Sequence, residues 1–182
     1  QDGSFAVHQR SVEWIRRERE ERTQNWAVLG MFPYNPSASK TAVFPPEDTI
    51  DLDATYPGWY RALRWKSWYP VASDGYEVDL DRALGPEFVC GPTSDHGIAY
   101  AYAELFGETR GEMSLVVGGD TRMEVYLNHT LVYSEESTEA PSVYLKLGKN
   151  TVLVKLYKTP GRFTFRLGFE ALRDPVRYRW WK

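Results

Sequence analysis

Cysteine is almost absent from this 182-residue sequence, histidine is rare, and no long hydrophobic run is present. Cys90 is the only cysteine, so the chain by itself can form neither an internal disulfide nor a cysteine-rich metal cluster. A membrane-spanning helix needs about 20 consecutive apolar residues, and no stretch approaches that length. The sequence therefore predicts a domain that is stabilised by its hydrophobic core and that has no membrane span.

An excess of positive charge is also missing. The 22 Lys and Arg residues are outnumbered by 25 Asp and Glu residues, which gives a net charge of -3. Nucleic-acid binding depends on clustered cations that displace the counterions of the phosphate backbone. We therefore expect no nucleic-acid partner. The hydrophobic content of 42% is ordinary for a globular domain, and the length is that of one domain with short appendages.

The first 23 residues differ in composition from the rest of the chain. Nine of the thirteen residues in 10–22 are charged, and Glu13 with Arg17 and Glu18 with Arg22 are favourable pairs four residues apart on a helix. Residues 1–23 therefore predict a short peripheral helix, with a solvated leader as the alternative.

From residue 24 onward, short apolar runs alternate with turn residues every 8–12 positions, which is typical of an all-β sandwich. Residues 123–127 and 131–133 flank Asn128-His129 and predict a hairpin. Residues 151–157 alternate in polarity, as do residues 163–170, in which Phe163, Phe165, Leu167 and Phe169 fall on one side. Period two over consecutive hairpins predicts an antiparallel sheet with one buried face.

The first half of this region is less regular. Residues 26–32 and 50–52 predict strands, whereas 32–46 contain four prolines and predict a loop. We assign residues 24–172 to the sandwich. Residues 173–182 form a basic, Trp-rich tail that either folds back on the domain or leads to a following one.

Glycine, asparagine and aromatic residues recur in a fixed order over several of these predicted hairpins. The pattern consists of Trp26 with Gly30 and Phe32, Pro45-Pro46-Glu47, Trp65-Lys66, Val78-Asp79-Leu80, Ala99-Tyr100-Ala101-Tyr102, Gly119-Asp120, Val125-Tyr126-Leu127-Asn128, Leu145-Lys146-Leu147-Gly148-Lys149-Asn150, Leu153-Val154-Lys155 and Gly161-Arg162-Phe163-Thr164-Phe165. In this respect the chain resembles galactose-binding-like jelly-roll domains, which are carbohydrate-binding-module-like units appended to bacterial carbohydrate-active or surface proteins.

This resemblance implies a jelly-roll β-sandwich in a secreted protein, extracellular or periplasmic. It implies a non-catalytic accessory module whose partners are a glycan or polysaccharide and the neighbouring domains of a parent protein. It also implies a structural calcium ion, for which the sequence assigns no ligands. Members of the family usually have Asn-Gly where this chain has Asn128-His129, which predicts a different or wider turn.

Residue types that serve catalysis are present, but their spacing does not favour an active site. Ser94-Asp95-His96 are consecutive, whereas a triad needs side chains that converge from separate positions. No histidine has the spacing of a zinc-binding motif. The acidic run Glu47, Asp48, Asp51 and Asp53 could supply the carboxylate pair of a glycosidase, yet in an extended segment it would face solvent. We expect no catalytic residues.

The most unusual segment is rich in aromatic and basic residues between positions 59 and 69. Flat rings stack on the apolar faces of sugars and cations donate hydrogen bonds to hydroxyls, so this segment predicts a glycan-binding platform. Its candidate ligand-binding residues are Trp59, Tyr60, Arg61, Trp68 and Tyr69. Core packing or an interdomain contact would use the same residue types.

Three functional hypotheses follow. The first is a glycan-binding module and the second is a structural spacer without its own ligand. A free-standing enzyme is the most distant. Exposed, adjacent rings in the aromatic segment would favour the first, and buried rings the second.

Overall fold

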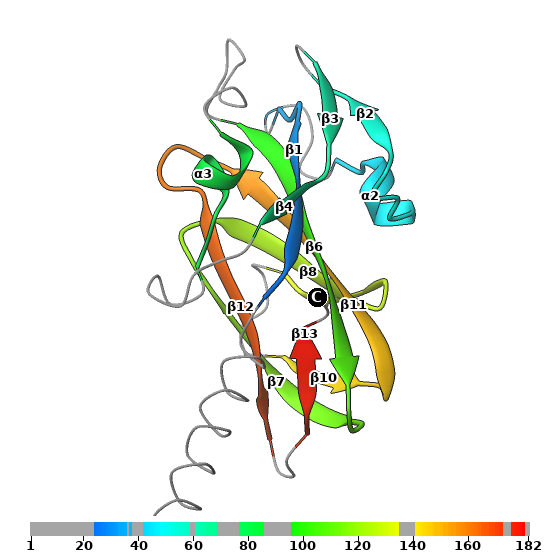
Figure 1. The fold of residues 1–182 in the computed structure, drawn as a ribbon. Coiled ribbons are helices and arrows are strands. Elements are labelled where there is room, and N and C mark those ends of the chain that lie inside the picture. The colour runs from blue at the N-terminus through cyan, green and yellow to red at the C-terminus, as the bar shows by residue number, and fades with distance from the viewer. Residues whose placement is uncertain are drawn as a thin grey trace, which may run out of the picture.

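The computed structural model describes residues 24–35, 37, 42–58, 61–68, 77–85, 96–134, 141–172 and 176–180. Within these ranges the chain forms a β-sandwich with a seven-stranded sheet, a four-stranded sheet and a separate two-stranded hairpin, all antiparallel (Figure 1). The predicted all-β antiparallel sandwich is therefore confirmed. No helix in the described part of the chain is long and apolar enough to cross a membrane.

The larger sheet has the order β4-β1-β6-β11-β8-β9, with β13 also paired to β6. Its strands are β1 (Trp26–Phe32), β4 (Lys66–Trp68), β6 (Gly97–Gly107), β8 (Arg122–Leu127), β9 (Thr130–Tyr133), β11 (Gly148–Lys158) and β13 (Tyr178–Trp180). The smaller sheet has the order β10-β7-β12-β5. It comprises β5 (Val78–Asp79), β7 (Gly111–Gly118), β10 (Ser142–Leu145) and β12 (Thr164–Ala171).

Three short elements complete the fold. The hairpin pairs β2 (Thr55–Pro57) with β3 (Ala62–Arg64). Helix α2 (Pro45–Asp48) precedes this hairpin, and helix α3 (Leu80–Leu84) follows β5. Figure 1 shows α2, β2 and β3 on the side of the larger sheet that faces away from the smaller one.

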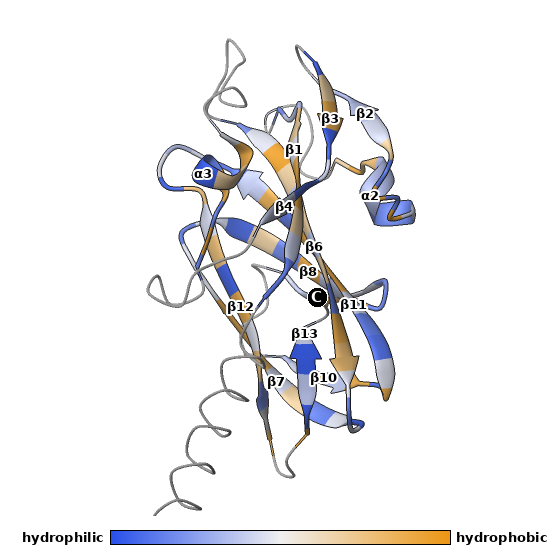
Figure 2. Ribbon diagram, viewed as in Figure 1, coloured by the Kyte–Doolittle hydropathy of each residue, from blue (hydrophilic) through white to orange (hydrophobic). Residues whose placement is uncertain are grey.

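The main core lies between the two sheets. Phe163, Phe165, Leu167 and Phe169 are all buried on one side of the β12 segment, as their alternation predicts, and Figure 2 shows the changing polarity along β12. The Trp26 ring meets the Phe165 ring edge to face, with centroids 5.2 Å apart. Large apolar side chains from both sheets therefore fill the interior.

The prediction of a single buried face is wrong for β11, the central strand. Leu153, Lys155 and Tyr157 point away from the main core and are nevertheless buried. Leu153 and Tyr157 belong to a second hydrophobic cluster, which includes side chains of the covering segment, residues 42–58 and 61–65. The Lys155 side chain contacts the same segment at Ala42. This segment forms a third layer, so both faces of β11 are shielded from water.

The β8–β9 hairpin closes with a two-residue turn, as predicted from Asn128-His129. Asn128 has a φ of 51° and His129 a φ of 66°. Two consecutive positive φ values are the pattern of a type I′ turn, which matches the twist of antiparallel strands. The expectation of a different or wider turn is therefore wrong, because His129 adopts the left-handed conformation that glycine usually supplies.

A buried amide connects this turn to the next one. The side chain of Asn150 donates to the carbonyl oxygens of Lys146 (2.8 Å) and Gly148 (3.1 Å), and its Oδ1 accepts from the side chain of Asn128 (3.0 Å). The Oδ1 of Asn128 in turn accepts from the backbone N–H of Thr151 (3.1 Å). The β8–β9 and β10–β11 turns are thus held together by two asparagine side chains.

Residues 50–52 are not a strand, contrary to the sequence prediction. The Asp51 carbonyl accepts from the N–H of Ala54 (3.3 Å), and the Asp51 side chain accepts from the N–H of Asp53 (3.0 Å). A local side-chain hydrogen bond of this kind stabilises a turn in competition with a strand ladder. The predicted N-terminal helix, residues 1–23, lies outside the described residues.

Part of the tail, Tyr178–Trp180, forms β13 and pairs antiparallel with β6 from Gly107 to Leu105. Strand β1 pairs antiparallel with the same strand, with Ala27 opposite Tyr102. Since β11 occupies the other edge of β6 over its whole length, β13 and β1 lie end to end along one edge. Both point in the same direction (Figure 1).

Candidate functional site

The predicted aromatic platform is only partly described. Trp59, Tyr60 and Tyr69 lie outside the described residues, and Arg61 is exposed just before β3. Trp68 lies on strand β4 and is half-buried against the main core. Its indole N–H is buried without an acceptor among the described residues. Trp68 therefore packs against the main core.

The acidic run of Glu47, Asp48, Asp51 and Asp53 does not form the carboxylate pair of a glycosidase site. Glu47 lies in α2 and accepts hydrogen bonds, Asp48 is exposed, and Asp51 and Asp53 belong to one exposed turn. No group of three or more His, Cys, Asp and Glu side chains among the described residues could hold a metal ion. The hypothesis of a structural calcium therefore has no ligand set in this part of the chain.

A buried lysine lies beneath the covering segment. The side chain of Lys155 is 2% exposed, and its Nζ is 2.9 Å from Oε1 of Glu47 and 4.0 Å from Oε2 of Glu124. The same Nζ donates to the carbonyl oxygen of Ala42. Two carboxylates and a carbonyl thus surround one ammonium group, which offsets the cost of removing the charge from water.

Three tyrosine hydroxyls complete this cluster. Tyr100 donates to Oε1 of Glu47 (2.5 Å), while Tyr126 and Tyr157 donate to the two oxygens of Glu124 (2.8 and 2.7 Å). Burial, and then these hydrogen bonds to carboxylates, raise the pKa of all three hydroxyls well above the ordinary value. The hydroxyls therefore remain protonated donors, and the cluster holds α2 against the larger sheet.

A fourth tyrosine on this face of the larger sheet also donates a hydrogen bond to a carboxylate. Tyr102 donates to Glu104 (2.7 Å), and burial together with this bond raises the pKa of the hydroxyl. Burial alone would raise the pKa of the Glu104 carboxyl, but the hydrogen bonds from Lys149 and Tyr102 outweigh it and lower that pKa. Lys149 lies 2.6 Å from Glu104 and is 60% exposed, so this ion pair is a surface feature.

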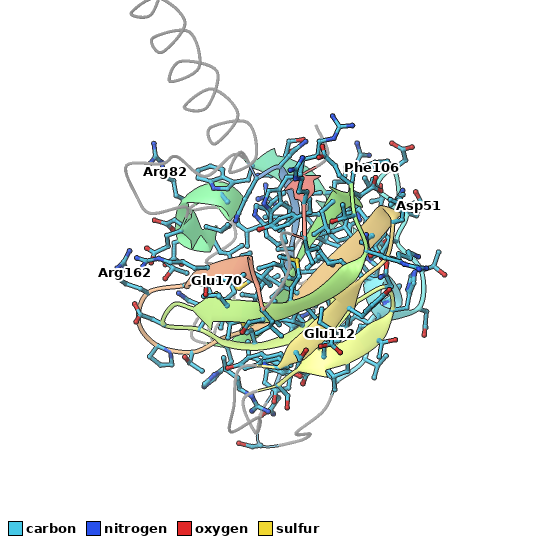
Figure 3. All side chains as sticks on the ribbon, turned by 90° about the horizontal axis from the view of Figure 1, so that it is seen from below. Asp51, Arg82, Phe106, Glu112, Arg162 and Glu170 are labelled. Carbon is cyan, nitrogen blue, oxygen red and sulfur yellow. The ribbon has the colours of Figure 1, made fainter. Side chains whose placement is uncertain are left out.

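The outer face of the smaller sheet is open to solvent. Tyr144 on β10 is 55% exposed and is the only aromatic residue in the described ranges that is classed as exposed. It lies opposite Glu112 of β7, and the next outward pair on these strands is Ser142 and Ser114. Glu170 of β12 lies opposite Ser114 on the other side. Figure 3 labels Glu112 and Glu170 on their two neighbouring strands.

Further along β7, the side chains on the same face of the sheet are smaller. Val116, which is 42% exposed, lies opposite Gly168, and no atom lies within 4 Å of the position that a Cβ of Gly168 would occupy. Beyond it, Arg166 is opposite Gly118, and its guanidinium is 3.2 Å from Glu77. Among the described residues, this face thus presents the ring of Tyr144, small side chains and the carboxylates of Glu112 and Glu170, while Arg166 is paired with Glu77.

A shallow hollow is present at the β7–β8 turn. It has a volume of about 220 Å³ and is lined by residues 117–123 together with Tyr133 at the end of β9. None of the residues in this hollow, and none on the outer face of the smaller sheet, was predicted from the sequence to bind a ligand. For Tyr144 a signal existed, because Val143 and Leu145 alternate with it and are the inward residues of the strand.

No protein-family model, curated protein or solved structure matches this chain.

Proposed function

We propose that this domain is a non-catalytic accessory module of a secreted multidomain protein and that it binds a glycan through the outer face of the smaller sheet. The observation that carries the proposal is Tyr144, an exposed ring on a hydrogen-bonded strand. An aromatic ring fixed on a strand loses little conformational entropy when it contacts a ligand, and its flat apolar surface suits the apolar face of a sugar ring.

The neighbours of Tyr144 supply the polar part of such a contact. The carboxylates of Glu112 and Glu170 accept hydrogen bonds, and the hydroxyls of Ser114 and Ser142 donate and accept them. From the position of Glu112 to that of Gly118, β7 extends over roughly 20 Å at the usual rise per residue. This length favours an extended ligand over a compact one. The absence of a side chain at Gly168 favours it too, because a ligand can lie close to the strands there.

The charge of this face favours a neutral glycan. Glu112 and Glu170 are both exposed, whereas the cation at the far end, Arg166, forms an ion pair with Glu77. An acidic polysaccharide would bring its carboxylates close to Glu112 and Glu170, which form no ion pair with another described residue, and this is unfavourable. We therefore expect neutral polysaccharides to bind better than polyuronates.

An interdomain scaffold remains the second candidate, and the half-buried position of Trp68 favours it. The proposal can be tested by screening the purified full chain against a polysaccharide panel that includes neutral and acidic polymers, with calorimetric titration of any positive result. Tyr144→Ala should weaken binding by about one to two decades, because stacking on an aromatic side chain contributes ~1–3 kcal/mol. Circular dichroism would establish that the variant folds.

Leu131→Ala provides a matched control, since Leu131 is 50% exposed on β9 of the other sheet. This variant should retain the wild-type affinity. Absence of binding to every polymer would contradict the glycan proposal and leave the scaffold. Full affinity in the folded Tyr144→Ala variant, with loss in Trp59→Ala, would move the site to the aromatic segment predicted from the sequence.

A further inference from the structure

The smaller sheet ends at an open edge, strand β10. Among the described strands, β10 pairs with β7 alone. The carbonyl oxygen of Pro141 accepts from the N–H of Leu115 on β7 (3.0 Å), and bonded and non-bonded pairs alternate along an antiparallel ladder. The backbone groups of the odd-numbered residues of β10 therefore point towards β7. The N–H and C=O groups of Ser142 and Tyr144 point away from the sheet, along its free edge.

This edge lacks the features that usually prevent strands from pairing between molecules. Natural edge strands are blocked by charged side chains, prolines or bulges, or are very short. The four residues of β10 include no charge and no proline, and the register with β7 has no shift. Pro141 lies just before the strand, but the N–H that it lacks would face β7 and not the free edge.

The other edge strands in the described part of the chain are shorter or irregular. Strand β9 also has four residues, but its pairing with β8 contains a register shift. Strands β4 and β5 have three and two residues. Strand β10 is therefore the longest regular edge that the described residues offer for strand addition.

The inward side chains of β10 hold this edge in place. Val143 and Leu145 are buried in the main core, at 4% and 0% exposure, whereas Ser142 and Tyr144 are exposed on the outer face. A strand that is already anchored loses little conformational entropy when its free edge is paired. The edge is thus preformed for the addition of another strand, a common mode of protein recognition.

The same edge is complementary to a second copy of itself. An antiparallel pair with a two-fold axis at Val143 places Ser142 of each copy opposite Tyr144 of the other. Both residues have their backbone groups on the free edge, so each of these two pairs can form the two hydrogen bonds of a bonded antiparallel pair. On the outer face a small side chain lies opposite a large ring, and no like charges meet across the axis.

We propose that two copies of this chain associate through β10 into a symmetric dimer, in which the two smaller sheets become one continuous sheet. One short strand from each copy buries less than the roughly 1,200 Å² at the lower end of standard interfaces, so the dimer is weak and depends on concentration. The inference goes beyond the proposed glycan binding and does not rest on it. It would, however, bring Tyr144 of both copies onto one face, so that the second copy adds a ring to the candidate site.

Sedimentation velocity of the purified full chain over a concentration series tests the association. We expect the average mass to rise from the 21.0 kDa of one chain towards twice that value. The series should extend to about 1 mM, because small interfaces give weak complexes.

Two double variants that differ at one position test the register. Ser142→Lys with Tyr144→Lys places like charges opposite one another in both cross-strand pairs, whereas Ser142→Glu with Tyr144→Lys places opposite charges there. The dimer Kd should be at least about tenfold higher in the first variant than in the second. Tyr144→Lys is opposite Glu112 of the same chain and occurs in both variants, so its effect on the fold is shared. Circular dichroism would establish that both fold.

Leu131→Lys is the control, since it places a charge on the other four-residue edge strand, β9. This variant should retain the wild-type Kd.

The proposal is overturned if the wild-type mass stays at that of one chain throughout the series. Equal Kd values in the two double variants would also overturn it, because pairing at β10 would then not determine the association. Loss of the dimer in Leu131→Lys would place the interface at β9 and overturn it as well. A monomeric chain that binds a polysaccharide would reject the dimer alone, and a dimer that binds no polysaccharide would reject the glycan proposal alone.

Discussion

Lys155 provides the sharpest test of how the third layer is held on the larger sheet. Its ammonium group is buried between Glu47 of α2 and Glu124 of β8. Lys155→Met would keep most of the apolar stem but remove the charge, which leaves two carboxylates without their cation. Removing one partner of a buried ion pair typically costs about 3–5 kcal/mol. Since native domains are stable by only about 5–15 kcal/mol, this one change should remove a large share of the total.

The assay is equilibrium unfolding in denaturant followed by tryptophan fluorescence. Lys155→Met should lower the midpoint strongly, and Lys155→Met with Glu47→Gln should restore part of the loss, because glutamine is neutral and can still accept from Tyr100. Residues in direct contact show interaction energies of about 0.5–3 kcal/mol in such double-mutant cycles. Lys149→Met is the matched control, since its pair with Glu104 is at the surface and should contribute at most about 1 kcal/mol.

Two results would refute this reasoning. The first is a cost of Lys155→Met no larger than that of Lys149→Met, which would mean that the buried charge is compensated in another way. The second is strict additivity of Lys155→Met and Glu47→Gln, which would mean that the two side chains do not interact energetically.

The remaining predictions concern the main core and the buried hydroxyls. Phe165→Ala should cost about 3–5 kcal/mol, as expected for truncation of a buried aromatic, and an unchanged melting temperature would contradict the packing of β12. Tyr100, Tyr102, Tyr126 and Tyr157 all have a raised pKa in the folded state, so the unfolded chain releases protons first as the pH rises past about 10. The contribution of these tyrosines to stability should be constant below that pH and fall above it. Near-ultraviolet absorbance should show fewer ionised tyrosines in the folded protein than in the unfolded one. Equal titration of folded and unfolded protein would contradict the hydrogen bonds to Glu47, Glu104 and Glu124.

The second half of the fold could be predicted from the sequence because its strands follow one another as hairpins. The alternation from Phe163 to Phe169 and the hairpin at Asn128-His129 are local signals, and the structure confirms both, although the turn is not the different or wider one that was expected. Tyr144 could also be assigned to the outer face from the alternation around it, although its exposure depends on the edge position of β10.

The third layer could not be predicted, because it depends on contacts between residues far apart in the chain. Lys155 meets Ala42 across 113 positions, and Tyr100 meets Glu47 across 53. A lysine within an alternating strand normally indicates a solvent-exposed face, and only the covering segment makes this one interior. The turn at Asp51 depends instead on a local contact. The hydrogen bond from the N–H of Asp53 to the Asp51 side chain outweighs the strand pattern of residues 50–52.

The end-to-end arrangement of β13 and β1 on one edge of β6 brings the first and last strands of the described residues to one place. Trp180 is opposite Leu105 and Ala27 is opposite Tyr102, and the rings of Trp26 and Trp180 lie 5.3 Å apart. The polypeptide therefore enters and leaves the sandwich at almost the same point. Tension between a preceding and a following segment would pass across this junction without loading β11 or β12. Within any longer chain the domain would behave as a side branch, and a circular permutant that joins Trp180 to Trp26 by a short connection would turn β13 and β1 into one continuous strand.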